Sequence, residues 1–197
     1  MTTLPDKIEH SKRLMREAIE KYPRIAVAVS WGKDSMVLLH LVRQIKPDIP
    51  VFTVITPFKP KETLEFKDRI IKEWNLNIKE YRSNQKPIPR LWETDPDECC
   101  RIFKVEPTKE AVKDLDAWIS GLRRTEGRTR RDYQEIEKRG NIVKINPLLE
   151  WTELDIWRYS ALYNVPQNPL YKKGYRSLGC APCTSIVSND EPERAGR

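Results

Sequence analysis

The feature that most constrains this chain is an apolar run that ends in a short polar turn and is followed by a second apolar run. Residues 25–29 have the length and the β-branched content of a buried strand, whereas the apolar spacing of residues 36–42 is typical of a helix. The sequence Ser-Trp-Gly-Lys-Asp-Ser, residues 30–35, lies between them. We therefore predict a strand, a tight loop and a helix in direct succession.

The predicted loop has the features of an anion site. Because a helix begins at its far end, backbone N–H groups and the positive end of the helix dipole point toward whatever lies above the strand. Lys33 adds a positive charge, Ser30 and Ser35 add hydroxyl groups, and Asp34 or Ser35 is placed to cap the helix. The loop is not a Walker A loop, because Asp34 follows the Gly-Lys pair where that motif has Ser or Thr.

This loop resembles the pyrophosphatase-type loop Ser-Gly-Gly-Lys-Asp-Ser of the adenine-nucleotide α-hydrolase-like superfamily. The resemblance implies that Ser30, Gly32, Lys33, Asp34 and Ser35 hold a nucleotide. Here Trp31 replaces the first glycine of the pattern, and we expect its bulky side chain to point outward. The alternative is that Lys33 and Asp34 merely form the polar start of a helix.

Strand and helix patterns alternate along the chain. This rhythm predicts a single α/β domain over residues 1–197, with a Rossmann-like, parallel or mostly parallel sheet flanked by helices. We expect strands at 25–29, 51–55, 77–81, 117–120 and 142–145, and helices at 8–20, 36–42, 61–74, 104–113 and from Thr152 onward, where Asp155 completes a capping box. The connections are expected at 83–96, at 125–139 as a charged mobile stretch, and at 166–183. Ligands of such sheets bind at the carboxyl ends of the strands, where the loops at Ser30 and Thr56 emerge.

The charge balance favours an anionic ligand. The 36 lysines and arginines exceed the 29 acidic residues by seven, and the sequence pI is about 9.2. Basic and acidic residues are interspersed along the helices, so we do not expect nucleic acid as a partner. The sequence contains neither an apolar run near the ~18 residues of a membrane span nor the apolar core of a signal peptide, and we expect a soluble, cytoplasmic protein without a membrane partner. The sequence does not determine the oligomeric state, and a homo-oligomer is one of the possibilities.

Four cysteines occur in two groups, the adjacent Cys99 and Cys100 and the pair Cys180 and Cys183 with C-x2-C spacing. In a reducing compartment such cysteines serve more often as metal ligands or redox groups than as disulfides. Adjacent side chains diverge, so they fit the separate irons of a cubane better than a single zinc ion. We predict a [4Fe–4S] cluster, with zinc, disulfides and unligated thiols as the alternatives.

Three stretches together resemble the assimilatory adenylylsulfate (APS) reductases of the phosphoadenylylsulfate/APS reductase family. They are Cys-Cys-Arg-Ile-Phe-Lys-Val-Glu-Pro at 99–107, Gly-Leu-Arg-Arg at 121–124 and Tyr-Arg-Ser-Leu-Gly-Cys-Ala-Pro-Cys-Thr at 175–184. Family members that use phosphoadenylylsulfate and carry no cluster lack both cysteine pairs. The resemblance implies a cytosolic enzyme that binds adenosine 5′-phosphosulfate beside a [4Fe–4S] cluster. Such an enzyme reduces APS to sulfite and AMP, with thioredoxin or glutaredoxin as the reductant.

The resemblance also assigns roles to individual residues. Lys104 would lie between cluster and sulfate, and Gly121, Arg123 and Arg124 would approach the phosphosulfate. Arg194 and Arg197 would bind the sulfate end, a role that suits the guanidinium fork. The cluster ligands would be Cys99, Cys100, Cys180 and Cys183. The alternatives are a surface ion pair for Arg123 and Arg124, and a disordered terminus for Arg194 and Arg197.

Two departures from the family pattern qualify this interpretation. The family has Asp-Thr-Gly where this sequence has Ile-Thr-Pro at 55–57, so we expect different contacts to the nucleoside. The family's nucleophilic cysteine lies in a Glu-Cys-Gly-Leu-His tail that residues 1–197 do not contain. We expect that this tail has been cut off, proteolysed or left out of the sequence, and that residues 1–197 bind APS without turning it over, because the covalent thiosulfonate step needs a thiolate.

Two other functions remain open: an ATP-dependent adenylyl or sulfur transferase with an iron–sulfur cluster, and a non-catalytic iron–sulfur nucleotide-binding module.

Overall fold

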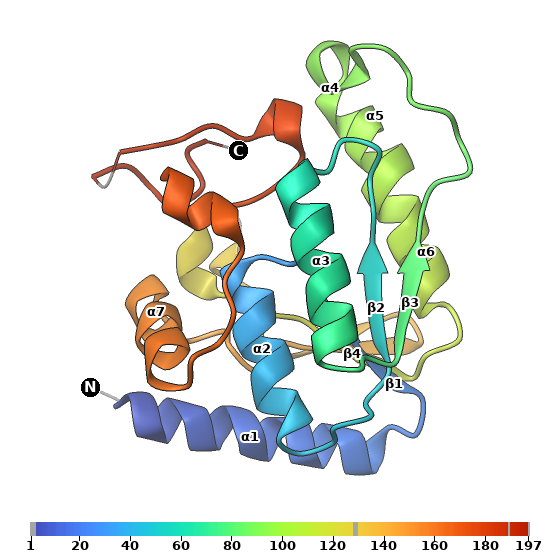
Figure 1. Cartoon of the computed structure of the whole chain (residues 1–197). Helices are drawn as coiled ribbons and strands as arrows, with labels where there is room; N and C mark the ends of the chain where they lie inside the picture. The colour runs from blue at the N-terminus through green and yellow to red at the C-terminus, as the bar shows by residue number, and fades with distance from the viewer. Residues whose placement is uncertain (1–2, 128–129, 189, 197) are drawn as a thin grey trace.

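The central element is a six-stranded sheet in the order β3-β2-β1-β4-β6-β5. The computed structural model describes residues 3–127, 130–188 and 190–196 (Figure 1). All neighbouring strands are parallel except β5 and β6, which form an antiparallel hairpin. The strands are β1 Ile25–Ala28, β2 Val51–Val54, β3 Ile78–Tyr81, β4 Ala117–Ile119, β5 Ile136–Arg139 and β6 Ile142–Ile145. The predicted α/β architecture with a mostly parallel sheet is confirmed.

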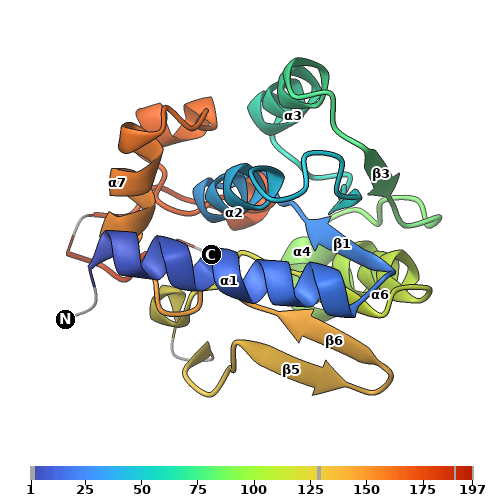
Figure 2. The same cartoon turned by 90° about the horizontal axis from the view of Figure 1, so that it is seen from below.

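Helices cover both faces of the sheet, with α2 and α3 on one side and α6 on the other (Figure 2). The side chains of β1 alternate between these faces, as in any strand. Ile25 and Val27 pack into the main core with residues of α1, α2, α3 and α7, whereas Ala26 packs with Ala111 of α6. The helices are α1 Leu4–Lys21, α2 Lys33–Arg43, α3 Lys61–Glu73, α4 Leu91–Thr94, α5 Pro96–Cys100, α6 Glu106–Val112 and α7 Glu153–Leu162.

The helix predicted from residue 104 begins earlier than its apolar pattern indicates. Asp95 caps α5 through a hydrogen bond from the backbone N–H of Glu98, and a π-helical turn, Arg101–Val105, joins α5 directly to α6. Pro96 is favourable at this position, because the first turn of a helix does not need its N–H. As a result Cys99 and Cys100 lie on a helix rather than in a loop.

Two other expectations about elements were wrong. The stretch 125–139 is not irregular throughout, because its end forms β5 by pairing with β6. β5 has the sequence Ile-Glu-Lys-Arg, without an apolar pattern, because pairing with β6 through the backbone does not require one. Asp34 and Ser35 do not cap α2, whose N-cap is Gly32 without a side-chain hydrogen bond.

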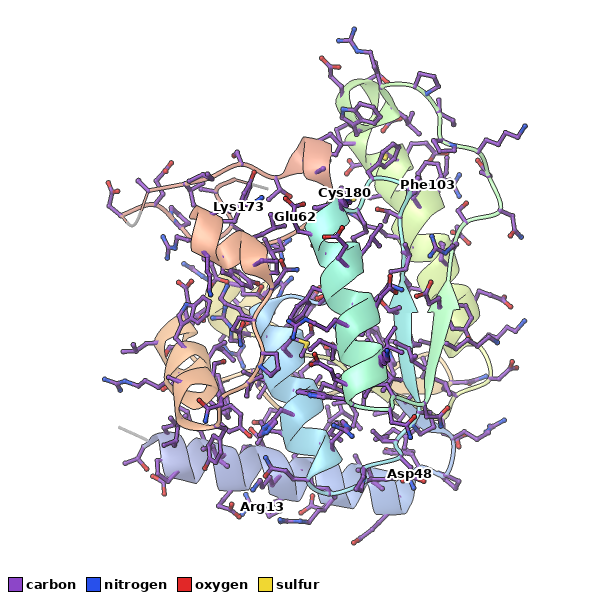
Figure 3. The ribbon with its side chains drawn as sticks, in the orientation of Figure 1. Arg13, Asp48, Glu62, Phe103, Lys173 and Cys180 are labelled. Atoms are coloured by element: carbon purple, nitrogen blue, oxygen red, sulfur yellow. The ribbon has the colours of Figure 1, made fainter. Side chains whose placement is uncertain are left out.

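The other capping prediction is confirmed, since Thr152 caps α7 in a capping box with Asp155. The region 166–183 contains two short 3-10 turns, Pro169–Lys173 and Ala181–Cys183. An ion pair between Lys173 and Glu62 at 2.6 Å connects the first turn to α3. Both residues are labelled in Figure 3. Within the ranges described, none of the helices combines the length and the apolar character that a membrane crossing needs.

Candidate active site

A cavity of about 400 Å³ opens where β1, β2 and β4 end. Its apolar wall comes from the sheet face that α6 covers and includes Ala28, Phe52 and Trp118. Its rim includes Ser30, Gly32, Asp34, Ser35 and Gly121, all of which the sequence placed at a nucleotide site. The cavity therefore lies at the edge where ligands of parallel sheets bind.

The loop after β1 is fixed from beneath by Trp31. Contrary to expectation, the Trp31 side chain points into the core and is fully buried, because Trp31 takes the left-handed backbone conformation with φ 70°. Its indole N–H donates to the Thr53 hydroxyl at 2.9 Å, so the buried nitrogen is satisfied. The Trp31 side chain thus stays clear of the cavity.

Close contacts set the shape of the loop. Ser35 Oγ donates to the carbonyl of Gly32 at 2.9 Å, and the backbone N–H of Lys33 donates to the Tyr171 hydroxyl at 2.7 Å. Gly121, at the end of β4, approaches the start of α2 so closely that a Cβ there would lie 3.1 Å from the carbonyl oxygen of Asp34. A side chain at position 121 would push this edge of the cavity apart.

The ammonium group of Lys33 is engaged inside the protein. Its Nζ lies 2.6 Å from Glu193 Oε1 and donates to the carbonyl of Arg176 at 2.6 Å. Only 1% of the Lys33 side chain is exposed. Although Lys33 contributes to the cavity wall, its charge is already balanced by a carboxylate of the C-terminal segment.

The two arginines of the Gly-Leu-Arg-Arg stretch have different surroundings, and neither lines the cavity. Arg123 is fully buried and pairs with Asp34 and with Glu193, to which its Nη2 donates at 2.6 and 2.8 Å. Burial alone would lower the pKa of Arg123, but the two carboxylates outweigh this effect and raise it. Arg124 points elsewhere and pairs with Glu150 at 2.7 Å.

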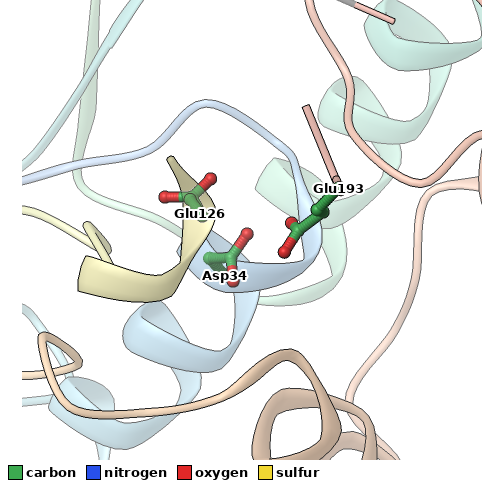
Figure 4. A group of neighbouring side chains, drawn as sticks. All are labelled: Asp34, Glu126 and Glu193. Carbon is green, nitrogen blue, oxygen red and sulfur yellow. The ribbon is translucent and has the colours of Figure 1, made fainter. Parts of the chain in front are cut away.

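Three carboxylates, those of Asp34, Glu126 and Glu193, lie close together beside the start of α2 (Figure 4). Asp34 and Glu126 line the cavity, whereas Glu193 does not. The three come from the start of α2, from the 3-10 turn Arg124–Glu126 and from the C-terminal segment, and one oxygen of each lies within 4.8 Å of the others. Lys33, Arg123, Arg130 and Arg194 pair with members of this group. Because cations of the protein already pair with each of these carboxylates, we do not interpret the group as a metal site.

The C-terminal arginines were expected at the sulfate end of the substrate. Arg194 lines the cavity, with its Nη1 3.8 Å from Glu126 Oε1. Arg197 lies outside the described residues.

The two cysteine pairs lie near each other, and Cys180 lines the cavity. None of the four forms a disulfide. Burial raises the pKa of the Cys99 thiol, and the nearby thiols of the other three cysteines raise it further. Figure 3 shows Cys180 and Phe103 at the same end of the molecule, where Phe58 stacks edge to face on Phe103. The structure thus brings together two cysteine pairs about eighty residues apart.

Polar groups connect the cysteines to the cavity. Lys104 Nζ donates to Cys100 Sγ at 3.5 Å, and the Thr56 hydroxyl lies 3.2 Å from Cys180 Sγ. Lys104, Thr56 and Cys180 also line the cavity. A ligand in the cavity would therefore contact the same residues that surround the thiols.

Several polar cavity residues were missed by the sequence reasoning. They share no motif, because they come from separate elements; they are Lys59, Thr108, Glu126, Arg130 and Lys144. One sequence feature could have identified Lys144 as a cavity residue. It is a charged residue within an apolar strand, which indicates that its side chain faces a polar space. Burial lowers its pKa to about 8, and Arg139 and Arg130 lower it too, against the nearby Glu137.

Residues 24–186 match the model of the phosphoadenosine phosphosulfate reductase domain, which therefore spans the sheet, the loop after β1 and both cysteine pairs. The chain belongs to this reductase family. It is 35% identical over 205 residues to adenosine 5′-phosphosulfate reductase of Staphylococcus epidermidis, which covers 98% of this chain and 84% of that protein. It is also 36% identical over 186 residues to adenosine 5′-phosphosulfate reductase 1 of Bacillus subtilis, with 88% and 79% covered.

Solved structures show the same fold in this reductase family and outside it. Phosphoadenylyl-sulfate reductase of Candida auris superimposes with a TM-score of 0.77 and 23% identity over 90% of both chains. Candida glabrata FMN adenylyltransferase gives a TM-score of 0.73 at 20% identity, over 98% of this chain and 74% of that one. At such low identities these structures support the fold alone.

Proposed function

We propose that this protein is an assimilatory APS reductase, which reduces adenosine 5′-phosphosulfate to sulfite and AMP. The observation that carries the proposal is that one cavity is lined by the nucleotide-type loop after β1, by Cys180 and by Lys104, whose ammonium group contacts Cys100. The curated relatives named above are adenosine 5′-phosphosulfate reductases and match most of the chain.

The cavity has the chemistry that such a substrate requires. Its apolar wall of Ala28, Phe52 and Trp118 suits a purine, and the loop at 30–35 supplies hydroxyl and backbone groups for phosphate. Lys104 and Arg194 place positive charge in the cavity for the sulfo group. We assign Ser30, Gly32, Ser35 and Gly121 to the nucleotide, whereas Lys33, Asp34 and Arg123 hold the site together.

We further propose that Cys99, Cys100, Cys180 and Cys183 hold a [4Fe–4S] cluster. A zinc ion binds four sulfurs at about 2.3 Å and would draw them close together. The adjacent side chains of Cys99 and Cys100 diverge, which suits a cubane, in which each thiolate binds its own iron. When bound, the cluster would add its charge beside the sulfo group.

The reaction that we propose transfers a sulfo group and then two electrons. A cysteine thiolate attacks the sulfur of APS, an S–S bond forms, the bond from sulfur to the phosphate oxygen breaks, and AMP leaves. One thiol of a dithiol reductant then attacks the cysteine sulfur of the thiosulfonate, and sulfite leaves with the electron pair of the S–S bond. The second thiol attacks the resulting mixed disulfide, so the enzyme cysteine is released as a thiolate and the reductant ends as a disulfide. We propose a thioredoxin or glutaredoxin for this role, on the basis of the family resemblance alone.

All four cysteines of residues 1–197 are assigned to the cluster, so the attacking thiolate must come from outside this stretch. We therefore expect residues 1–197 alone to bind APS without turnover. Lys104 and Arg194 would withdraw charge from the sulfo group, and the loop at 30–35 would hold the leaving phosphate.

The test combines metal analysis with ligand binding. Protein purified without oxygen should contain about four irons and four sulfides per chain, and the double variant Cys99→Ser, Cys100→Ser should lose both. The exposed Lys109, on α6 just beyond these cysteines, offers the matched control Lys109→Gln, which should keep the metal. Calorimetry should show that APS binds more tightly than ATP.

Three results would contradict the proposal. If freshly prepared anaerobic protein contains stoichiometric zinc or no metal, the proposed cluster is refuted. ATP consumption with release of pyrophosphate would identify an adenylyl or sulfur transferase instead. A full-length protein that binds APS and the cluster but shows no turnover with a dithiol would be a non-catalytic binding module.

A further inference from the structure

Glu193 is a buried acid in the C-terminal segment, and two buried cations surround its carboxylate. Its carboxylate accepts hydrogen bonds from Lys33 Nζ at 2.6 Å and from Arg123 Nη2 at 2.6 and 2.8 Å. The side chains of Glu193, Lys33 and Arg123 are 6%, 1% and 0% exposed. A long-range ion pair of this kind fixes the segment to the start of α2 and to the end of β4.

The same segment is clamped again three residues later. The backbone N–H of Ser185 donates to the carbonyl of Gly196 at 2.9 Å. A Cβ at position 196 would lie only 2.4 Å from the carbonyl oxygen of Ser185, so this approach requires glycine. Arg194 lies between the two anchors and lines the cavity beside Glu126.

We propose that Glu193 is a positioning residue that places Arg194 in the cavity, with Lys33 and Arg123 as its buried counter-cations rather than as ligands of the substrate. The proposal rests on the proposed function only in that Arg194 is taken to face the sulfo end of APS. It gives Lys33, the lysine of the loop, a structural role.

The geometry distinguishes this role from autoinhibition, in which Glu193 would occupy the place of a substrate anion. Glu193 is absent from the described lining of the cavity, whereas Arg194, the next residue, belongs to it. Lys33 Nζ lies 5.3 Å from the ring centre of Tyr171 and 5.9 Å from that of Trp157, so aromatic rings flank the ammonium group that pairs with Glu193. The carboxylate therefore anchors the segment beneath the cavity instead of filling it.

The test compares two ligands that differ by the sulfo group. In the variant Glu193→Gln we expect APS to bind at least tenfold more weakly, while AMP binding stays within about threefold of the wild type. Arg194→Gln should cause the same selective loss, and the double variant should be no worse than either single variant, since Glu193 acts through Arg194. The matched control is Glu191→Gln, in the same segment, whose carboxylate accepts from the backbone of Ser188 at the surface.

Each other outcome has a defined meaning. Tighter APS binding in Glu193→Gln would show that the carboxylate competes with substrate, and equal loss of APS and AMP would show a purely structural role. Unchanged affinity for both, or additive losses in the double variant, would overturn the proposal as well. If Glu193→Gln does not fold, the same criteria apply to Glu193→Asp, which keeps the charge but shortens the reach. A wild-type protein that fails to bind APS would refute the proposed function instead.

Discussion

The indole nitrogen of Trp31 donates a hydrogen bond to the Thr53 hydroxyl at 2.9 Å, beneath the loop that borders the cavity. The Thr53 hydroxyl in turn donates to the carbonyl of Val29 at 2.7 Å. One buried chain of hydrogen bonds therefore connects β2, the residue that follows β1 and the loop at 30–35. The large side chain therefore braces the loop from the core side and leaves the opposite side open for a ligand.

We expect Thr53→Val to destabilise the protein by about 1–3 kcal/mol, because the buried indole N–H loses its acceptor. Trp31→Ala should cost about 3–5 kcal/mol, the range for deleting a large buried side chain. Urea unfolding measures both effects. Thr94→Val, at an exposed threonine, should change the free energy of unfolding by less than about 0.5 kcal/mol. Equal effects at positions 53 and 94 would contradict the bracing role of Trp31.

Arg123 and Arg124 should respond differently to the same substitution. Arg123→Gln leaves the buried carboxylates of Asp34 and Glu193 short of a cation and should destabilise the fold by about 3–5 kcal/mol. Arg124→Gln removes a partly exposed pair with Glu150 and should cost at most about 1 kcal/mol, with APS affinity unchanged. Thermal unfolding measures the two losses of stability, and calorimetric titration measures the affinity for APS. A large loss of APS affinity in Arg124→Gln would show that Arg124 reaches the substrate after all.

Lys144 should make stability depend on pH in the alkaline range. Its pKa is about 8 in the folded protein and 10.5 ordinarily, so the unfolded chain binds the extra proton between these values. The free energy of unfolding should therefore rise as pH increases from about 8 to about 10.5, by about 1–3 kcal/mol. The rise should be absent in Lys144→Met and retained in Lys138→Met, at an exposed lysine on the neighbouring β5. Identical pH profiles for the wild type and Lys144→Met would rule out this origin.

Lys104 is expected to bind the sulfo group but not to hold the metal. Lys104→Gln should weaken APS binding about tenfold or more, because a hydrogen bond to a charged group contributes about 1.5–3 kcal/mol. AMP affinity and iron content should remain those of the wild type. Lys109→Gln, at an exposed lysine that pairs with Glu106, serves as the control. Loss of iron in Lys104→Gln would assign Lys104 to the cluster site instead.

Much of the site could be predicted from local patterns. The loop 30–35 stands out because a buried strand, small polar residues and a helix must follow one another in a short space. The cysteine pairs were predicted to meet, and they lie near each other, with Cys180 in the cavity wall. Lys104 was expected between the cysteines and the substrate, and it lies next to Cys100 at the cavity wall.

The orientation of individual side chains could not be read from these patterns. Trp31 was expected to point outward, but a left-handed backbone conformation turns it into the core. Arg123 and Arg124 look alike in sequence, yet Arg123 is extended whereas Arg124 begins the 3-10 turn Arg124–Glu126. Arg123 is therefore buried among carboxylates while Arg124 pairs with Glu150.

Local sequence patterns were enough to predict the α/β fold, the nucleotide-type loop and a shared role for the four cysteines, because these depend on periodicity and on residue types that few other structures require. Which charges face the cavity and which are neutralised inside depends on the packing of distant segments. Lys33, Arg123 and Glu193 lie far apart along the chain, and a buried charge is stable only where the fold brings it an opposite partner. That pairing is a property of the packed molecule and is absent from any single stretch of sequence.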